Sequence, residues 1–317
     1  MAYALKPGKP PAKRVRKLLL RQMRTLREQL GRGVEATDGF HDARKSVKRA
    51  RALLILARPS LGEAWRQMDR AWRDLGRRLS SMRDAQVMAG ILSRVERERG
   101  AAFLGEAGAH MRAGLAAQRA QGEKVDIEAV TAMLQMCEQN VALLPDGLGV
   151  GELLDGLAAD YKGGRHALEQ ARGTGSAEEW HELRKHVQRH QRHMQLFAPA
   201  WPEEMATRLG LAKVVAEALG EDHDLWMLGE GLRGLDPVTL TDGSLERLLD
   251  HCRAGETALR ERAAAAAERL LAERPKALRA RLLAYWQAQP IPAAAAEQDP
   301  KRIASRGQRR AAARQET

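Results

Sequence analysis

Three features are scarce or missing in this sequence, and each scarcity argues against a class of protein. The chain has two cysteines in 317 residues, Cys137 and Cys252, and they form no CxxC pair, which argues against a disulfide framework or a cysteine-rich metal site. Aromatic residues make up 4%, few for a surface built on base stacking. No run approaches the ~20 apolar residues that span a bilayer, and the first residues lack the apolar stretch of a secretory signal. We therefore expect a cytoplasmic protein with reduced cysteines and no membrane partner.

Basic residues, in contrast, are abundant. The sequence holds 53 lysines and arginines against 41 aspartates and glutamates, which gives a formal net charge of +12. Such a balance indicates an anionic partner, namely nucleic acid, an acidic membrane surface or a phosphate polymer. Alanine, leucine, arginine, glutamate and glutamine dominate and β-branched residues are few, so we predict helix nearly throughout.

One segment occurs twice, 140 positions apart. The sequence HDARKSVKR at 41–49 corresponds to HELRKHVQR at 181–189. The same offset, without a gap, pairs Val47 with Val187, Leu56 with Leu196, Pro59 with Pro199, Arg73 with Lys213 and Asp84 with Asp224. A single offset that links so many positions indicates an internal duplication.

Hydrophobic periodicity and capping signals predict an all-α fold of duplicated helical bundles. Helices are expected at 13–30, 38–58, 61–82, from 84, at 103–121, 124–144, 152–172, 177–198, 201–221, briefly after 224, and at 245–273 and 276–288. The predicted domains are a flexible basic arm (1–11), a first helical half (12–150), a second helical half (151–290) and a disordered basic tail (291–317). The simplest arrangement is two helical bundles, one from each half, related by a pseudo-two-fold axis.

Rows of cations follow single helical faces. At 100° per residue, Arg44, Lys45 and Lys48 lie within about 60° of His41, and Arg184, Lys185 and Arg192 share the side of His181. Further candidate binding residues on these and neighbouring helices are Arg49, Arg51, Arg189, Arg14, Lys17, Arg21, Arg24, Arg73, Arg77 and Lys213, with Arg66 and Arg70 in the same row as Arg73. The rows hold almost no acid, and like charges at this spacing repel, so we expect a ligand to supply the negative charge.

Other chemistry is less well supported by the pattern. His186, His190 and His193 lie within about 60° on one helix, yet no matching trio, HExxH motif or cysteine ligand accompanies them, so we expect no metal and no cofactor. His41 and His181 have no serine or cysteine nucleophile at a recognisable elbow, so we expect them to donate to phosphate rather than to catalyse. Asp84 and Asp224 are interpreted as helix caps or as residues that orient the neighbouring motif.

The repeated His-x-x-Arg-Lys-x-x-x-Arg helix resembles the CHAD family, the conserved histidine α-helical domains, over about 12–290. The resemblance implies two four-helix-bundle halves around a basic central channel that binds inorganic polyphosphate, and in some members association with polyphosphate granules. The family's basic positions correspond here to His41, Arg44, Lys45, Lys48 and Arg49, then His181, Arg184, Lys185 and Arg189. Gln188 departs from the pattern where the first copy has Lys48, and Arg192 is a possible substitute.

The expected function is therefore non-enzymatic binding of inorganic polyphosphate. No ExExK strand motif is present, so no phosphatase or cyclase activity is inferred, and no residue is assigned a catalytic role. The alternatives are a nucleic-acid-binding helical protein, for which no specific recognition motif is visible, and a polyphosphate-processing enzyme, for which no metal–carboxylate cluster is visible.

Overall fold

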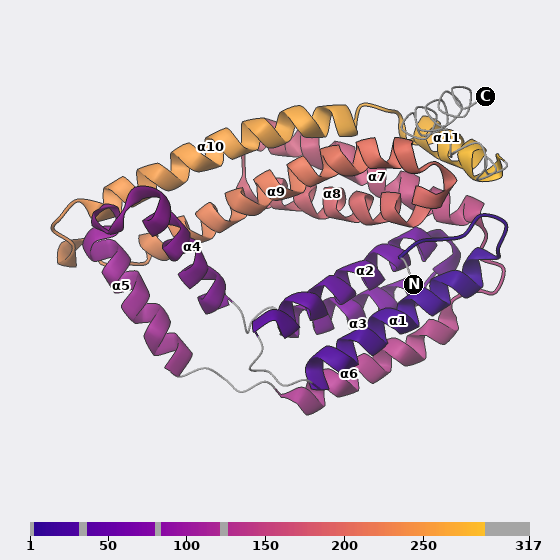
Figure 1. Cartoon of the computed structure of the whole chain (residues 1–317), viewed down its shortest axis with the longest axis horizontal. Helices are drawn as coiled ribbons and strands as arrows, with labels where there is room; N and C mark the ends of the chain where they lie inside the picture. The colour runs from indigo at the N-terminus through magenta and orange to yellow at the C-terminus, as the bar shows by residue number, and fades with distance from the viewer. Residues whose placement is uncertain (1–2, 32–36, 80–83, 121–125, 289–317) are drawn as a thin grey trace, which may run out of the picture.

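The computed structural model describes residues 3–31, 37–79, 84–120 and 126–288, and only the backbone of 37–41, 84–85 and 119–120. These residues form α-helices joined by turns and short 3-10 helices, with no strand among them (Figure 1). The α-helices are α1 (Pro11–Gly31), α2 (Thr37–Leu61), α3 (Ala64–Arg78), α4 (Asp84–Arg99), α5 (Ala101–Ala120), α6 (Ile127–Gln139), α7 (Val150–Thr174), α8 (Ala177–Phe197), α9 (Pro202–Arg233), α10 (Ser244–Leu270) and α11 (Pro275–Gln287). The all-α prediction is confirmed.

Two helices run past the ends that the sequence predicts. The prediction ended a helix at Arg58, but α2 continues through Pro59 to Leu61. The prediction also broke a helix near 221–224, whereas α9 is continuous over that region. The cap interpretation of Asp224 is therefore wrong: this residue lies inside α9, where its carboxylate is 3.5 Å from the guanidinium of Arg94 on α4. The side chain of Asp84, the first residue of α4, lies outside the described side chains.

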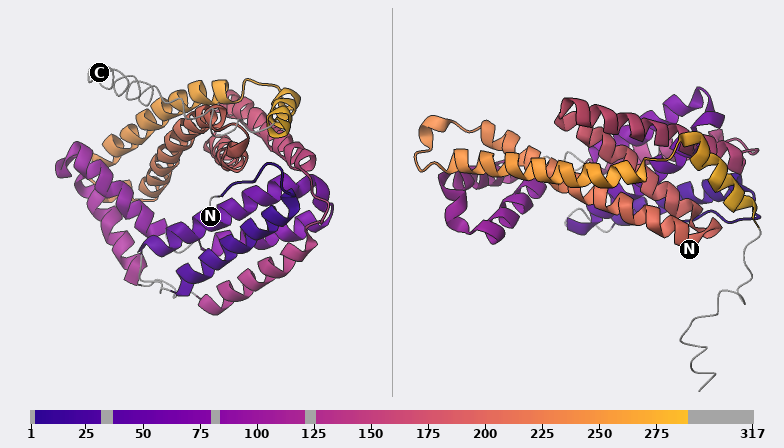
Figure 2. Two further views of the ribbon diagram at one scale, coloured as in Figure 1. Left: turned by 45° about the vertical axis from the view of Figure 1, so that its right-hand side comes forward. Right: turned by 90° about the horizontal axis from the view of Figure 1, so that it is seen from above.

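The apolar core forms two clusters, and each joins helices from both parts of the chain. The larger cluster packs α1, α2, α3 and α6 against α7, α8, α11, the first half of α9 and the end of α10. The smaller one packs α4 and α5 against the end of α9 and the start of α10. Figure 2 shows α9 and α10 side by side along much of the molecule, reaching from one cluster to the other. None of the described helices is both long and apolar enough to cross a membrane.

Residues 3–10, within the segment predicted to be a flexible basic arm, make defined contacts with the helices. Leu5 is buried, and its backbone N–H donates to the carbonyl of Leu196 at 2.8 Å. The hydroxyl of Tyr3 donates to the carbonyl of Arg49 at 2.8 Å, and Arg14 Nε donates to the carbonyl of Ala4 at 2.7 Å. An apolar anchor and three hydrogen bonds hold residues 3–10 against α1, α2 and the end of α8. The predicted tail, 291–317, lies outside the described residues.

The two parts of the chain meet where α2 packs on α7 and α8. Gly156 of α7 faces the backbone of α2 so closely that a Cβ atom there would lie 2.3 Å from the carbonyl oxygen of Leu56. Pro59, inside α2, has no N–H to donate to the carbonyl of Ile55, whose oxygen would lie 2.8 Å from the same Cβ atom. On α8, Nε2 of the buried His193 lies 3.0 Å from the carbonyl oxygen of Ala52. Backbone contacts of this kind fix α2 relative to the second half.

The first prediction concerns this contact. Gly156→Ala should destabilise the protein by roughly 1–3 kcal/mol, because the added methyl overlaps the Leu56 carbonyl and forces α2 and α7 apart. Gly173→Ala, on an exposed turn of the same helix with open space around it, is the matched control and should stabilise by about 0.5–1 kcal/mol. Denaturant unfolding of both variants makes the comparison. Equal stability of the two variants would contradict close packing at Gly156.

Candidate functional site

The second copy of the repeated motif lies on the first turns of α8. Ser176 caps this helix by accepting a hydrogen bond from the Glu179 N–H at 3.3 Å, as the sequence predicts for its start. Leu183 and Val187 are buried in the core, so the helical period turns the motif cations away from it. Lys185 is exposed, and Arg184 is half-buried.

The first copy has the same pattern on α2. Ala43, Val47 and Ala50 are buried, which leaves the cations between them at the surface. Lys45, Lys48 and Arg49 are exposed and Arg44 is half-buried, while the side chain of His41 lies outside the described residues. The motif therefore occupies equivalent faces of α2 and α8.

The two motifs approach each other through Arg44 and Arg184. Burial lowers the pKa of Arg184. The nearby carboxylate of Asp224 raises it, the positive charge of Arg44 lowers it to a smaller extent, and Asp222 also raises it. Arg184 lies against α9 at Gly220, where a Cβ atom would be 3.1 Å from Nη2. The Nε atom of Arg184 is buried without a hydrogen-bond partner among the described residues. A partly buried guanidinium with one N–H lacking a partner among the described residues favours an anion beside it.

A second convergence involves Arg49 of α2 and Arg192 of α8. Burial lowers the pKa of Arg192 to about 10, and the charges of Arg49 and Arg189 act in the same direction. Arg192 donates to the carbonyl of Gln188, and the guanidinium of Arg49 lies 5.7 Å from the ring centre of Tyr3. Cations of α2 and α8 thus influence one another at two places along these helices, Arg44 with Arg184 and Arg49 with Arg192.

His181 is accompanied by two aromatic rings that the sequence analysis did not single out. Its ring centre lies 4.7 Å from that of His223, which in turn stacks on Trp226 at 5.7 Å and 17°. Both partners lie on α9, and only the fold brings them to α8. Burial, then Lys185, lowers the pKa of His181 to about 4. The ring is therefore neutral near pH 7, and it can donate to a phosphate only through one N–H, not as an imidazolium.

Arg189, a predicted phosphate-binding residue, is paired with a carboxylate. Its Nε atom lies 2.8 Å from a carboxylate oxygen of Asp160, a buried residue of α7 that the sequence analysis missed. His186 Nδ1 lies 2.9 Å from the same oxygen. The pKa of Asp160 is lowered to about 2, because the hydrogen bond from His186 and the charge of Arg189 outweigh its burial. This arrangement assigns Arg189 to a buried ion pair that joins α7 and α8.

The histidine stripe of α8 is divided among separate environments. His190 is buried at a ring-centre distance of 5.4 Å from Tyr161, and His193 faces the carbonyl of Ala52 on α2. Burial lowers the pKa of His190 to about 3 and that of His193 to about 4. Within the described part of the chain, no group of three or more histidine, cysteine or carboxylate side chains is arranged to hold a metal ion.

Many of the predicted cations have acidic neighbours, so the description of the rows as almost free of acid is wrong. The ion pairs are Lys45–Asp42 (3.0 Å), Arg51–Asp69 (2.9 Å), Arg73–Asp69 (3.0 Å), Arg77–Asp74 (3.6 Å), Lys185–Glu182 (2.9 Å) and Lys213–Glu217 (3.7 Å). Most of these carboxylates lie three or four residues away on the same helix, the usual spacing for such pairs. Lys17, Arg21 and Arg24 are exposed on α1 and form no ion pair with a described residue.

Comparison with known proteins identifies a family for this arrangement. The family model described as the CHAD domain matches residues 14–233, more than half of the chain, from α1 to the end of α9. Searches of the curated proteins and of the solved structures gave no significant match. The matched segment includes both copies of the motif.

The second prediction concerns the charge of His181. Its ring protons should titrate in an NMR experiment with a midpoint at about pH 4, because burial and Lys185 disfavour the imidazolium. The unfolded chain takes up this proton at about pH 6.5, so His181 contributes stability above that pH and loses it as the pH falls towards 4. His181→Gln assigns the resonance. A midpoint at or above 6.5 in the ligand-free protein would contradict the neutral ring.

Proposed function

This chain belongs to the CHAD domain family, and we propose that it binds inorganic polyphosphate along the basic faces of α2 and α8 without cutting or building it. The observation that carries the proposal is that partly buried cations of α8 lie close enough to cations of α2 for their charges to interact, Arg184 with Arg44 and Arg192 with Arg49. Like charges brought together under partial burial are unfavourable alone. A chain of phosphates beside them would add to the negative charge that Asp222 and Asp224 already place near Arg184, and would accept from Arg184 Nε, which has no hydrogen-bond partner among the described residues.

The shape of the basic face suits a linear ligand. From His181 to Arg192 the face follows α8 for eleven residues, which is about 16 Å at 1.5 Å per residue. Arginine forks bind phosphate oxygens in pairs, and a repeating anion can use successive cations without any base-reading contact. The exposed stripe of Lys17, Arg21 and Arg24 on α1 would extend attraction for the same polymer.

We further infer that the two motif helices belong to duplicated halves related by a pseudo-two-fold axis, with the basic faces lining a channel between them. The support is the order of elements: α1 and α2 precede α3 as α7 and α8 precede α9, and each motif lies near the start of the second helix in its half. Association with polyphosphate granules would follow from the same binding, in a protein that we expect in the cytoplasm.

A binding role is favoured over a catalytic one by the acids nearest the site. Asp222 lies 2.7 Å from Arg260 of α10, and Asp224 pairs with Arg94 of α4. Enzymes that transfer phosphoryl groups use carboxylates to hold magnesium, and ion pairs compete with that use. The rings of His223 and Trp226 beside His181 are the feature that favours the alternative, nucleic-acid binding, because bases stack on such rings.

The third prediction tests the residues. Replacing Arg44, Lys45, Arg184 and Lys185 together by alanine should weaken the binding of long-chain polyphosphate by more than about tenfold, a loss of at least about 1.4 kcal/mol. Replacing Arg233, Arg253, Arg262 and Arg269, exposed cations at the end of α9 and on α10, removes the same charge and is the matched control. Isothermal titration calorimetry measures both variants, and circular dichroism checks their helicity. Equal losses of polyphosphate affinity in the two variants would show that the effect comes from net charge and not from the motif residues.

The fourth prediction tests the ligand. Polyphosphate should displace single-stranded DNA of matched charge from the protein at physiological salt, because phosphate contacts dominate and ring stacking contributes little. The logarithm of the polyphosphate affinity should fall with the logarithm of salt concentration by about 0.7 per neutralised charge, as for single-stranded nucleic acids. Equal affinities for the two polymers, with loss of DNA binding in a Trp226→Ala variant, would favour the nucleic-acid alternative.

A further inference from the structure

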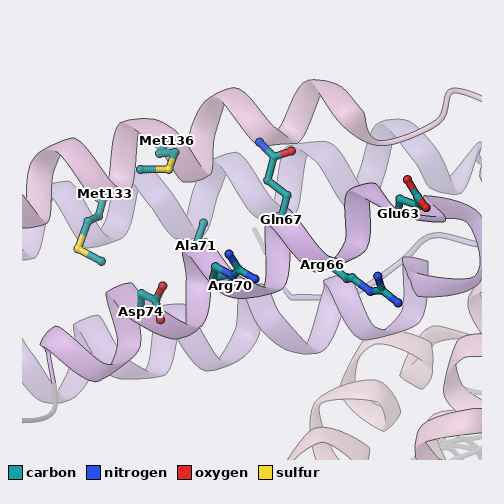
Figure 3. A pocket seen from close by; sticks show the side chains of 8 residues that line it. All are labelled: Glu63, Arg66, Gln67, Arg70, Ala71, Asp74, Met133 and Met136. Carbon is teal, nitrogen blue, oxygen red and sulfur yellow. The ribbon is translucent and has the colours of Figure 1, made fainter.

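A groove lies between α3 and α6, apart from the motif residues described above. Its volume is about 440 Å³, within the range of ligand-binding clefts. One wall is the exposed face of α3, and the other is α6 with Met133 and Met136 (Figure 3). The row of arginines on α3 divides here: Arg73 pairs with Asp69 beside Arg51 of α2, whereas Arg66 and Arg70 line the groove.

The charges along the groove have a definite order. Arg66 and Arg70 are exposed, one helical turn apart, and form no ion pair with a described residue. Glu63 and Asp74 lie before and after them along α3 and also line the groove. From Glu63 to Asp74 the wall extends about 16 Å, or three turns of helix. The charge order of the lining residues is therefore negative, positive, positive, negative, and the last carboxylate also lies 3.6 Å from Arg77 on the same helix.

The other wall is apolar and partly exposed. Met136 keeps 50% of its accessible surface, and Met133 is half-buried against the core. Flexible methionine side chains adapt to partners of different shape, and covering them is favourable for an apolar side chain but not for a phosphate. The carboxylate of Glu63 at one end of the α3 wall would also repel a long polyanion, whereas that of Asp74 at the other end is paired with Arg77. The groove therefore does not match the ligand of the basic faces.

The geometry points to a docking site for an amphipathic helix of a partner protein. The helix would place two carboxylates one turn apart against Arg66 and Arg70, a basic residue towards each of Glu63 and Asp74, and an apolar stripe on Met133 and Met136. A helix laid in a groove between two helices is a common mode of peptide recognition, read through anchors three and four residues apart. Opposite charges set its register.

A synthetic helix tests this assignment. The probe is a fluorescein-labelled peptide of about 15 residues, long enough to be helical, with a leucine stripe, two central glutamates and a lysine towards each end. The control peptide has the same composition with glutamates and lysines exchanged. Fluorescence anisotropy at physiological salt should show that the probe binds more tightly than the control. Because the two peptides carry the same net charge, attraction by net charge alone would not produce this difference.

Variants locate the peptide on the protein. The double change Arg66→Glu and Arg70→Glu should weaken binding of the probe by about tenfold or more and strengthen binding of the exchanged peptide. The matched control, Arg21→Glu with Arg24→Glu on α1, makes the same charge change and should leave the order of the two peptides intact. The bound probe should slow the oxidation of Met136, read by mass spectrometry against the buried reference Met68.

Three outcomes would overturn the assignment. Equal binding of the two peptides would exclude the charge order as a recognition element. A loss of polyphosphate affinity in the Arg66/Arg70 variant as large as that of the motif variant would make the groove part of the polyphosphate surface. A dimer that this variant dissociates, seen by light scattering while the probe fails to bind, would make the occupant a second copy of the chain. Loss of polyphosphate binding by the motif variant leaves the peptide result unaffected, so the two proposals fail separately.

Discussion

The arrangement of the basic faces depends on the backbone contact between α2 and the second half of the chain. Gly156 admits the carbonyl of Leu56 against α7, and His193 faces the carbonyl of Ala52 from α8. Such contacts hold two motif helices, distant in sequence, in one orientation. Close-packed interiors transmit small displacements. A shift of α2 by the width of a methyl group would therefore change the position of Arg44 relative to Arg184. Packing at a glycine and a buried histidine therefore sets the electrostatics at the surface.

On that surface some cations are paired with carboxylates, while Arg184 still has an N–H that could bind a ligand. Arg189 is held by Asp160, and Lys45 and Lys185 have acidic neighbours on their own helices. The buried Nε atom of Arg184 has no hydrogen-bond partner within the part of the chain that the structure describes. Exposed ion pairs of this kind contribute about 0–1 kcal/mol, so a multivalent anion can replace them at little cost. The burial that lowers the pKa of Arg184 also raises the strength of any phosphate contact made there. The partly buried Arg184 would thus make the stronger phosphate contact. The exposed lysines could exchange their carboxylate partners for phosphates.

Much of this could be predicted from the sequence, because helical period and duplication are local or linear signals. The all-helical fold, the capping of α8 by Ser176 and the outward position of the motif cations follow from residues three and four apart. Tertiary partners could not be predicted in the same way. From the sequence alone Asp224 is consistent with a helix cap, and its ion pair with Arg94 of α4 is visible only in the structure. The residues around Asp160 in the sequence likewise do not predict its ion pair with Arg189. Those contacts depend on which faces the helices bury together.

The central claim is that an anionic chain lies between α2 and α8. The most direct measurement is a crystal structure of the protein with bound polyphosphate of defined length. We predict phosphate oxygens within hydrogen-bond distance, about 2.7–3.2 Å, of Arg44 and Arg184, and a continuous chain that also reaches Arg49 and Arg192. Phosphates confined to the exposed stripe of α1 or to the α3–α6 groove, with the space between Arg44 and Arg184 filled by water alone, would contradict the account.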